Sequence, residues 1–344
     1  MTTTRRGFLG LTAAAIAAAP LKANAAATKY LYHGRYGDGV GIASYDAAGK
    51  ITSTGVLTGV ADPSFVIRSG NFLYAVNEQE AGAVTAIAID APGKLRRINS
   101  KSNKGSGPCH LAVAGSYLLS ANYGSGDIAV HKLNADGSIG TQTDLVKHAG
   151  TAPHAHQIVV KGNYILAVDL GTDSVYTYTL ANGKLALKYQ LTLTTGSGPR
   201  HLAFHPSGNF AYIANELNST ITVCSYADGK LTALSSQTTV PAGSPTNYPG
   251  EVVVSADGRY VYLTNRGHNS VAVFETSGST LTLKATPSAG GVWPRHAIID
   301  PTGTLLFVSN QNSGNIVTFA VDLASGSLTQ KSSFSTPTPV CVNV

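Results

Sequence analysis

Short apolar segments separated by polar turns run from Lys29 to the end of the chain. Each segment has four to six residues rich in Val, Ile, Tyr, Phe and Thr, a composition typical of β-strands. The turns that follow carry Gly beside Asp, Ser or Asn, as in Pro206–Asn209, and such turns join antiparallel strands. Long amphipathic helix patterns do not appear after Ala27. The pattern therefore predicts an all-β fold of many short strands.

Prolines mark a repeat among these segments. The spacings between them are 45, 45, 46, 50 and 45 residues, for Pro63, Pro108, Pro153, Pro199, Pro249 and Pro294. After each proline come a strand, a turn, a second strand ending in Asn or Asp, a polar turn and a third strand, and a further Gly turn leads into a fourth. The best copies begin at His201, Glu251 and His296. Four antiparallel strands in about 45 residues are typical of a propeller blade.

The two ends of the chain supply one further blade. Pro339 follows Pro294 by another 45 residues and begins a strand, PVCVNV, that ends at Val344. The segment Lys29–Asp46 has the later strands of a blade but no first strand. Together they complete a seventh blade and close the ring without an open sheet edge. We therefore expect a single seven-bladed β-propeller domain over residues 26–344, made of four-stranded antiparallel blades.

The first 25 residues have the pattern of an export signal. Arg5 and Arg6 are followed by Phe8 and Leu9, then by an apolar run and a small-residue segment that ends at Ala25. Paired arginines in this context indicate the twin-arginine route, so we expect residues 1–25 to be removed and the mature protein to be periplasmic or secreted. The alternative is that the segment stays uncleaved as a membrane anchor.

Charge and cysteine content exclude several classes of partner. Residues 1–25 contain three basic residues and no acid, so their removal lowers the net charge from +6 to +3. The rest of the chain has no Lys/Arg run typical of nucleic-acid binding and no basic amphipathic helix that would seek a membrane. Cys109, Cys224 and Cys341 are too few for a disulfide framework and lack the spacing of a zinc site. We expect a monomer whose cysteines are buried in different blades.

Titratable residues collect at one face of the predicted ring. The innermost strand of a blade starts at this face and the second strand returns to it, so residues beside each proline and each Asn share one rim of the central channel. The polar residues expected there are Glu78, His110, Tyr123, His154, His156, Asp169, Arg200, His201, Glu216, Arg266, His268, Arg295 and His296. We expect a polar pocket at this channel mouth. Asn122, Asn215, Asn265 and Asn310 recur in nearly every blade and are interpreted as turn-capping residues.

The positions at which the blades differ are the candidates for chemistry. They are the residue after the Asn or Asp and the residue after the proline. Arg200 and Arg266 can bind an anion through bidentate hydrogen bonds, beside the Glu216 carboxylate. His154 or His156 completes an acid/base pair with Glu216. The remaining candidates for substrate binding are Glu78, Tyr123, His201, His268, Arg295 and His296.

Five segments resemble the lactonase family of seven-bladed propellers. They are PHAHQ from Pro153, GPRHLAFHP from Gly198, NELNST from Asn215, NRGHNS from Asn265 and WPRHAIIDPTG from Trp293. The family includes bacterial propeller-type 6-phosphogluconolactonase and fungal carboxy-cis,cis-muconate cyclase. In the cyclase branch the proposed active site is a histidine, two arginines and a glutamate. The resemblance assigns these roles to a histidine of PHAHQ, Arg200, Glu216 and Arg266, and His154 fits the Pro-His position better than His156.

The leading hypothesis is hydrolysis of a sugar-acid type lactone, without a metal or another cofactor. The resemblance implies a small anionic lactone or carboxylate as the partner, although export is unusual for an enzyme whose phosphorylated substrate is made in the cytoplasm. One alternative is a muconate-type cycloisomerase that uses the same site. Another is a non-catalytic periplasmic binding or scaffold propeller. A metal site built from Glu78, Asp169 and Glu216 is disfavoured because these carboxylates belong to different blades.

Overall fold

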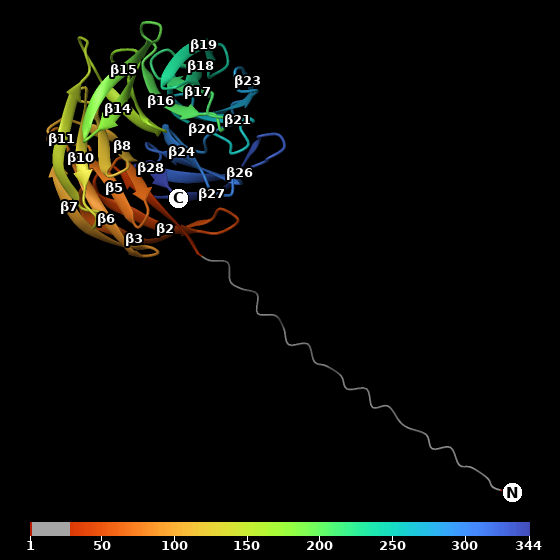
Figure 1. Ribbon diagram of the computed structural model, residues 1–344. Coiled ribbons are helices and arrows are strands. Elements are labelled where there is room, and N and C mark those ends of the chain that lie inside the picture. The colour runs from red at the N-terminus through yellow and green to blue at the C-terminus, as the bar shows by residue number, and fades with distance from the viewer. Residues whose placement is uncertain (2–27) are drawn as a thin grey trace.

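The computed structural model describes Met1 and residues 28–344, and this part of the chain forms seven four-stranded antiparallel sheets arranged as propeller blades (Figure 1). The seven-bladed all-β fold is confirmed. The predicted export signal, with Arg5 and Arg6, lies outside the described residues. Among the residues that are described, no helix is long and apolar enough to cross a membrane.

Each blade runs from an inner strand at the channel to an outer strand at the rim of the ring. Blade 1 consists of β4 (Val66–Ser69), β5 (Phe72–Asn77), β6 (Ala83–Ala91) and β7 (Lys94–Ser102). Blade 2 consists of β8 (Pro108–Ala114), β9 (Tyr117–Asn122), β10 (Asp127–Leu133) and β11 (Ile139–Lys147). Blade 3 consists of β12 (Ala155–Lys161), β13 (Tyr164–Asp169), β14 (Ser174–Ala181) and β15 (Lys184–Thr192). Blade 4 consists of β16 (Pro199–Phe204), β17 (Phe210–Asn215), β18 (Thr220–Ala227) and β19 (Lys230–Thr238). Blade 5 consists of β20 (Tyr248–Val254), β21 (Tyr260–Arg266), β22 (Ser270–Thr276) and β23 (Leu281–Ala285). Blade 6 consists of β24 (Pro294–Ile299), β25 (Leu305–Asn310), β26 (Asn315–Val321) and β27 (Leu328–Ser335).

Blade 7 joins the two ends of the chain. Its inner strand is β28 (Pro339–Asn343), which pairs with β1 (Lys29–Arg35), followed by β2 (Asp38–Tyr45) and β3 (Ile51–Ala61). The colour in Figure 1 runs once around the ring, so that the blue C-terminal strands return beside the red N-terminal ones. The split blade expected from the sequence is therefore confirmed.

The hydrophobic core is divided among the interfaces between neighbouring blades. Each of the seven clusters of buried apolar residues in the described part of the chain combines strands from two adjacent sheets. In one of them Tyr212 of blade 4 packs with Phe274 of blade 5, and both side chains are fully buried. Because the second strand of each blade is covered on both faces, it reads as an almost continuous apolar run rather than as a strict alternation, whereas outer strands such as β7 are mostly exposed.

One contact recurs at every blade interface. The first large residue of a second strand packs against a glycine in the outer turn of the next blade, as Tyr164 does on Gly229 and Tyr260 on Gly326. These glycines have positive φ values, +83° and +72° respectively, and an added Cβ would collide with the aromatic ring. Glycine is required here for both backbone conformation and close approach.

A β-bulge or register shift near the start of the inner strand is present in blades 2 to 7. In blade 1 Ser64 holds the equivalent position, since Val76 N donates to the carbonyl of the next residue, Phe65. In blade 4 Pro199 pairs with Asn215 and His201 with Ala214, so that Arg200 is the extra residue. Blade 3 has the same irregularity, but there Ala155 pairs with Asp169 and the extra residue is His156. The proline repeat therefore predicts the wrong register in blade 3, by two residues, because Pro153 precedes the strand instead of beginning it.

The three cysteines are free and buried, as expected. Cys109 lies in β8, Cys224 in β18 and Cys341 in β28, so they belong to three different blades. Burial raises the pKa of each thiol, which keeps the groups protonated and favours their role as small apolar side chains.

Candidate active site

Two rings of side chains, each with one residue per blade, surround the channel mouth. The first, which we call the bulge ring, contains Ser64, Cys109, His156, Arg200, Gly250, Arg295 and Val340. In blades 2 to 7 the residue before the bulge-ring member pairs with a residue at or next to the end of the second strand. The residue that follows this partner belongs to the second ring, the rim ring, in which Glu78 holds the equivalent position of blade 1: Tyr36, Glu78, Tyr123, Leu170, Glu216, Arg266 and Gln311. Bulges are known to reorient side chains beside active sites.

A cavity of about 250 Å³ lies between these rings. Its lining comes entirely from them: Tyr36, Glu78, Cys109, Tyr123, His156, Glu216, Arg266 and Arg295. Most of these groups are polar or charged, and they come from all seven blades. The cavity can therefore enclose a small, polar, anionic molecule.

Glu216 holds two of the arginines in an ion-pair network. Its Oε2 lies 2.6 Å from Arg266 Nη2 and 3.3 Å from Arg200 Nε. Backbone carbonyls fix the same guanidiniums, since Arg200 Nη1 donates to Gly250 O at 2.9 Å and Arg266 Nε to Tyr248 O at 3.0 Å. Burial, followed by repulsion from Arg266, lowers the pKa of Arg200 to about 9. Arg200 thus remains charged at neutral pH in a nearly water-free setting, where charges act strongly.

Arg295 is placed differently from the other two arginines. It lines the cavity, and its guanidinium carbon lies 5.8 Å from the centre of the Tyr36 ring. Within the described part of the chain it has neither a hydrogen-bond nor an ion-pair partner. The Tyr36 hydroxyl donates to Glu78 Oε1 at 3.1 Å, and burial raises the pKa of Tyr36 to about 12. Arg295 therefore offers a free set of donors to an anion that enters the cavity.

His156 supplies a neutral imidazole in the same space. The residue is 5% exposed, and burial, reinforced by the Arg200 charge, holds its pKa well below the ordinary value of 6.5. Its ring lies edge-on to Tyr123, and its Nδ1 has no hydrogen-bond partner among the described residues. A neutral histidine has a free lone pair and can accept a proton.

A third ring of residues, the channel plug, closes the channel below the cavity. It consists of Phe65, His110, Gln157, His201, Glu251, His296 and Cys341. His201 Nδ1 donates to Glu251 at 3.0 Å, and His296 Nε2 lies 3.4 Å from the same carboxylate. The void between the bulge ring and the channel plug is only about 10 Å³, roughly the space of one water molecule. The cavity therefore opens to one face of the ring.

Six of the residues that the sequence proposed line the cavity: Glu78, Tyr123, His156, Glu216, Arg266 and Arg295. Arg200 borders the void beneath it and pairs with Glu216. His201 and His296 lie lower, in the channel plug. His268 is on the turn after β21, where Ser270 Oγ donates to its Nδ1 at 2.7 Å, and it does not line the cavity.

His154 also lies outside the cavity, contrary to its place in the proline repeat. It stacks on Tyr123 with ring centres 4.4 Å apart, and its Nδ1 donates to the Tyr123 carbonyl at 2.8 Å. The physical reason is the register of β12, in which the bulge falls at His156. Asp169 is likewise outside, since its carboxylate accepts from His148 Nδ1 at 2.6 Å and from the His154 amide.

Sequence reasoning missed three residues that contribute to the site. Tyr36 belongs to the split blade, where no repeat proline marks the register. Glu251 occupies the position that His201 and His296 hold in their blades. A glutamate where the neighbouring blades have histidine is the sequence signal that identifies it. Trp293 precedes Pro294 and contacts Arg266. Comparison of all seven blades, including the split one, would have found them.

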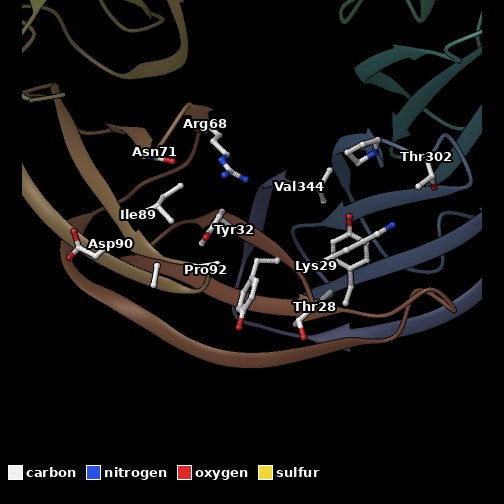
Figure 2. A pocket seen from close by; sticks show the side chains of 14 residues that line it. Thr28, Lys29, Tyr32, Arg68, Asn71, Ile89, Asp90, Pro92, Thr302 and Val344 are labelled. Carbon is white, nitrogen blue, oxygen red and sulfur yellow. The ribbon is translucent and has the colours of Figure 1, made fainter. Parts of the chain in front are cut away.

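A larger hollow lies at the opposite face of the ring. It measures about 570 Å³ and is bordered by Lys29, Tyr32, Arg68, Asp90 and Val344 (Figure 2). Lys29 is already paired with Asp300 at 3.3 Å, and Arg68 and Asp90 are exposed. Without a buried and unpaired polar group, this hollow lacks the convergent chemistry of the smaller cavity.

Among residues 28–344, no group of three or more His, Cys, Asp or Glu side chains is placed to hold a metal ion. Of the three carboxylates considered for such a site, Glu78 and Glu216 line the cavity, whereas Asp169 accepts hydrogen bonds elsewhere. The two carboxylates of the cavity lie with two arginines, Arg266 and Arg295, which recognise anions rather than cations.

Comparison with known proteins gives consistent matches along the chain. The profile of the family described as "Lactonase, 7-bladed beta-propeller" matches residues 27–344. A 6-phosphogluconolactonase from Bacillus subtilis (strain 168) is 35% identical over 342 residues, covering 92% of this chain and 98% of the relative.

Solved structures agree with these matches. A protein from Lactobacillus plantarum is 32% identical with a TM-score of 0.87, covering 92% of this chain and 98% of its own. The periplasmic gluconolactonase of Pseudomonas aeruginosa is 28% identical with a TM-score of 0.86, covering 92% of this chain and 99% of its own.

Proposed function

The chain belongs to the lactonase family of seven-bladed β-propellers, and on that premise we propose that it hydrolyses a lactone of the sugar-acid type in the cavity between the bulge ring and the rim ring. The observation that carries the proposal is the convergence of a neutral imidazole, His156, with the Arg200–Glu216–Arg266 network in one small space. A base and fixed positive charges are the groups that ester hydrolysis requires.

In the proposed reaction His156 accepts a proton from water as the water oxygen attacks the lactone carbonyl carbon. The electron pair of the carbonyl moves to its oxygen, and Arg200 and Arg266 stabilise the negative charge that develops there. The ring C–O bond then breaks, and protonated His156 returns its proton to the leaving alkoxide. The product is the open-chain hydroxy acid, and His156 is neutral again.

Glu216 serves in this scheme to position the arginines. Its carboxylate is bound to two guanidiniums, Arg200 and Arg266, and holds them side by side. Because carbonyl groups and Glu216 hold both arginines before substrate arrives, little reorganisation is needed during the reaction.

Arg295 is the proposed anchor for an anionic group of the substrate, because its donors are free. The relatives act on lactones with and without phosphate, a 6-phosphogluconolactonase in one case and a gluconolactonase in the other. Both lactones belong in the test. Two arginines, Arg266 and Arg295, line the cavity with two carboxylates, Glu78 and Glu216. Arg200 borders the void beneath the cavity, and its additional positive charge favours the phosphorylated lactone.

The experiment is to follow acid release at constant pH from glucono-1,5-lactone, its 6-phosphate and a panel of other aldonolactones, with the buffer reaction subtracted. We expect acceleration by the wild-type protein and a loss of at least about 100-fold in Arg266→Gln. No acceleration of any lactone would refute the proposal. Loss of the ultraviolet absorbance of a muconate diacid, without lactone hydrolysis, would instead identify a cycloisomerase.

We also propose that residues 1–25 direct export by the twin-arginine route. The support is the sequence pattern of these residues, together with a periplasmic relative in Pseudomonas aeruginosa. The test is cell fractionation of the full chain and of the double variant Arg5→Lys, Arg6→Lys. Export of both to the same extent would contradict the proposal.

A further inference from the structure

Trp293 occupies a position that recurs in the blades. The carbonyl of the residue before the proline accepts a hydrogen bond from the amide of the rim-ring residue: Gly107 O from Tyr123 N, Gly198 O from Glu216 N, and Trp293 O from Gln311 N, at 2.9, 2.7 and 3.0 Å. The position thus connects the start of the inner strand to the rim ring.

The backbone conformation at this position favours glycine. Its φ is +58° at both Gly107 and Gly198 and +67° at Trp293, whereas Asp62 and Thr338 hold the position with smaller values of +42° and +37°. A bulky side chain is rarely found at positive φ, where it costs free energy that glycine avoids. Trp293 is also the only tryptophan of the chain. A strained residue that departs from the repeat beside a cavity points to a role at that cavity.

The indole of Trp293 contacts Arg266. The guanidinium carbon lies 5.6 Å from the ring centre, within the range of a cation–π interaction, and Tyr248 packs against the indole at 5.8 Å. Arg266 is among the residues that line the cavity and Trp293 is not. The indole therefore contacts the guanidinium without lining the cavity itself.

Three polar groups hold the Arg266 guanidinium. Its Nη2 donates to Pro249 O at 2.9 Å as well as to Glu216, and its Nε donates to Tyr248 O. These contacts fix the guanidinium edge but do not cover its face. The side chain is nevertheless only 4% exposed, since the indole packs beside it.

We infer that Trp293 is a positioning residue that holds Arg266 and excludes water from its guanidinium, so that the charge of Arg266 acts on the reacting carbonyl. The catalytic part of this role rests on the proposed lactonase function. The effect of Trp293 on the binding of an anion by Arg266 rests only on the contact between these two side chains. The backbone strain at Trp293 is then retained because the indole is needed where blades 2 and 4 use glycine.

The first test separates the aromatic face from simple packing. Trp293→Phe keeps an aromatic ring, whereas Trp293→Leu keeps an apolar side chain without one. We expect Trp293→Leu to lower kcat on the best lactone about 10-fold with KM changed by less than about threefold, and Trp293→Phe to stay within about threefold of wild type. The inference is wrong if the Leu variant is as active as wild type, or if Phe is as defective as Leu.

The second test concerns stability. Trp293→Gly and Trp293→Ala both lose the indole, but only glycine relieves the strain of a positive φ. We expect the Gly variant to have the higher Tm and both to have the same low kcat. A Tm for Ala equal to or above that for Gly would contradict the claim that Trp293 is strained.

The third test does not depend on turnover. The wild-type fluorescence reports only on Trp293, so titration with gluconate, followed at the tryptophan emission, should show a saturable change if the anion reaches the Arg266 cavity. Gluconate binding that is unchanged in Trp293→Leu by calorimetry would overturn the inference even if lactones are hydrolysed. A saturable signal, with weaker binding in the Leu variant, would support it even if no lactone is opened.

Discussion

His156 is the one neutral proton acceptor among the charged groups that line the cavity. Burial keeps its pKa well below 6.5, whereas Glu216 is tied to two guanidiniums. The base function in the account therefore depends on a single residue. His154 is only two positions away, but it stacks on Tyr123 outside the cavity and uses its Nδ1 in a hydrogen bond to backbone.

Replacement of these two histidines should have very different effects. We expect His156→Gln to lower kcat on the best lactone by about 100-fold or more, because the proton acceptor is lost. The matched variant His154→Gln should lower it by less than about threefold. Steady-state kinetics at neutral pH measure both. Equal losses in the two variants, or a greater loss at His154, would show that the register argument does not identify the base.

A second residue-scale prediction concerns His33, which is 3% exposed in β1. Burial, with a smaller effect from Arg35, lowers the pKa of His33 to about 4. Below pH 6.5 the unfolded chain takes up a proton that the folded protein does not bind until about pH 4, so stability falls as the pH decreases across this window. The loss attributable to His33 between pH 7 and pH 5 is about 2 kcal/mol.

Denaturant unfolding at pH 7 and pH 5 tests this linkage. His33→Leu should lose about 2 kcal/mol less than wild type between these two pH values, whatever its stability at pH 7. Other buried histidines contribute to the pH dependence of stability in both proteins. One of them is His296, whose pKa is also lowered to about 4. Parallel losses in the two proteins would contradict a neutral, buried His33.

At the scale of the strand and turn, the repeat made most of the inner strands predictable. The proline begins the inner strand in blades 2, 4 and 6, and both arginines of the bulge ring there, Arg200 and Arg295, follow directly from it. Blade 3 differs because its ladder begins at Ala155, two residues after Pro153. Sequence spacing cannot detect this shift, since both registers leave a histidine at the start of the strand.

The contacts within the site were less predictable than its composition. The sequence predicted that Arg200, Glu216 and Arg266 lie at the channel mouth. The structure shows in addition that Glu216 forms ion pairs with both arginines. It also adds that Arg295 is free for an anion, whereas the sequence assigned that role to Arg200 and Arg266. Pairing depends on side-chain directions across three blades, which a one-dimensional repeat does not specify.

The glycines of the outer turns give a prediction at the same scale. Gly326 has a φ of +72° and touches the Tyr260 ring of the neighbouring blade. Gly303 has a φ of +77°, but the nearest atom to an added Cβ is 4.0 Å away. Gly303→Ala should cost only the backbone strain, about 1–2 kcal/mol. Gly326→Ala should cost about 1–3 kcal/mol more, because overpacking adds to it.

Thermal or denaturant unfolding of the two glycine variants measures this difference. A larger loss of stability in Gly326→Ala than in Gly303→Ala would locate the additional cost at the contact between blades. Equal losses would mean that the backbone conformation alone accounts for glycine at these turns.

On the scale of the whole molecule, the ring is closed by hydrogen bonds between β28 and β1 rather than by a covalent link. The sequence predicted this closure because the terminal segments are complementary parts of one blade. It could not predict the channel plug as a unit, since the interactions of Glu251 with His201 and His296 join three blades.

Deletion of residues 339–344 should prevent stable folding. It removes the inner strand of blade 7, in which Val340, Cys341 and Val342 are each at most 2% exposed, and it exposes the edge of β1. Burial of three such side chains contributes roughly 1.5–3 kcal/mol each, which is comparable to the total stability of many domains. We expect an aggregated or unfolded product by circular dichroism and gel filtration.

A circular permutant provides the control for this deletion. It begins at Asn209, ends at Gly208 and joins Val344 to Lys29 by a short linker, so that the split moves from blade 7 to blade 4 with all strands kept. We expect it to fold and to retain activity. A folded, active deletion variant, or an unfolded permutant, would contradict the closure described for blade 7.

The most direct test of the central claim is a crystal structure of the protein with gluconate, the product of glucono-1,5-lactone hydrolysis. We expect the acid inside the cavity between the bulge ring and the rim ring, with donors of Arg266 about 3 Å from its carboxylate and with His156 facing the same carboxylate. Gluconate bound only in the hollow at the opposite face, or an empty cavity at saturating concentration, would contradict this claim.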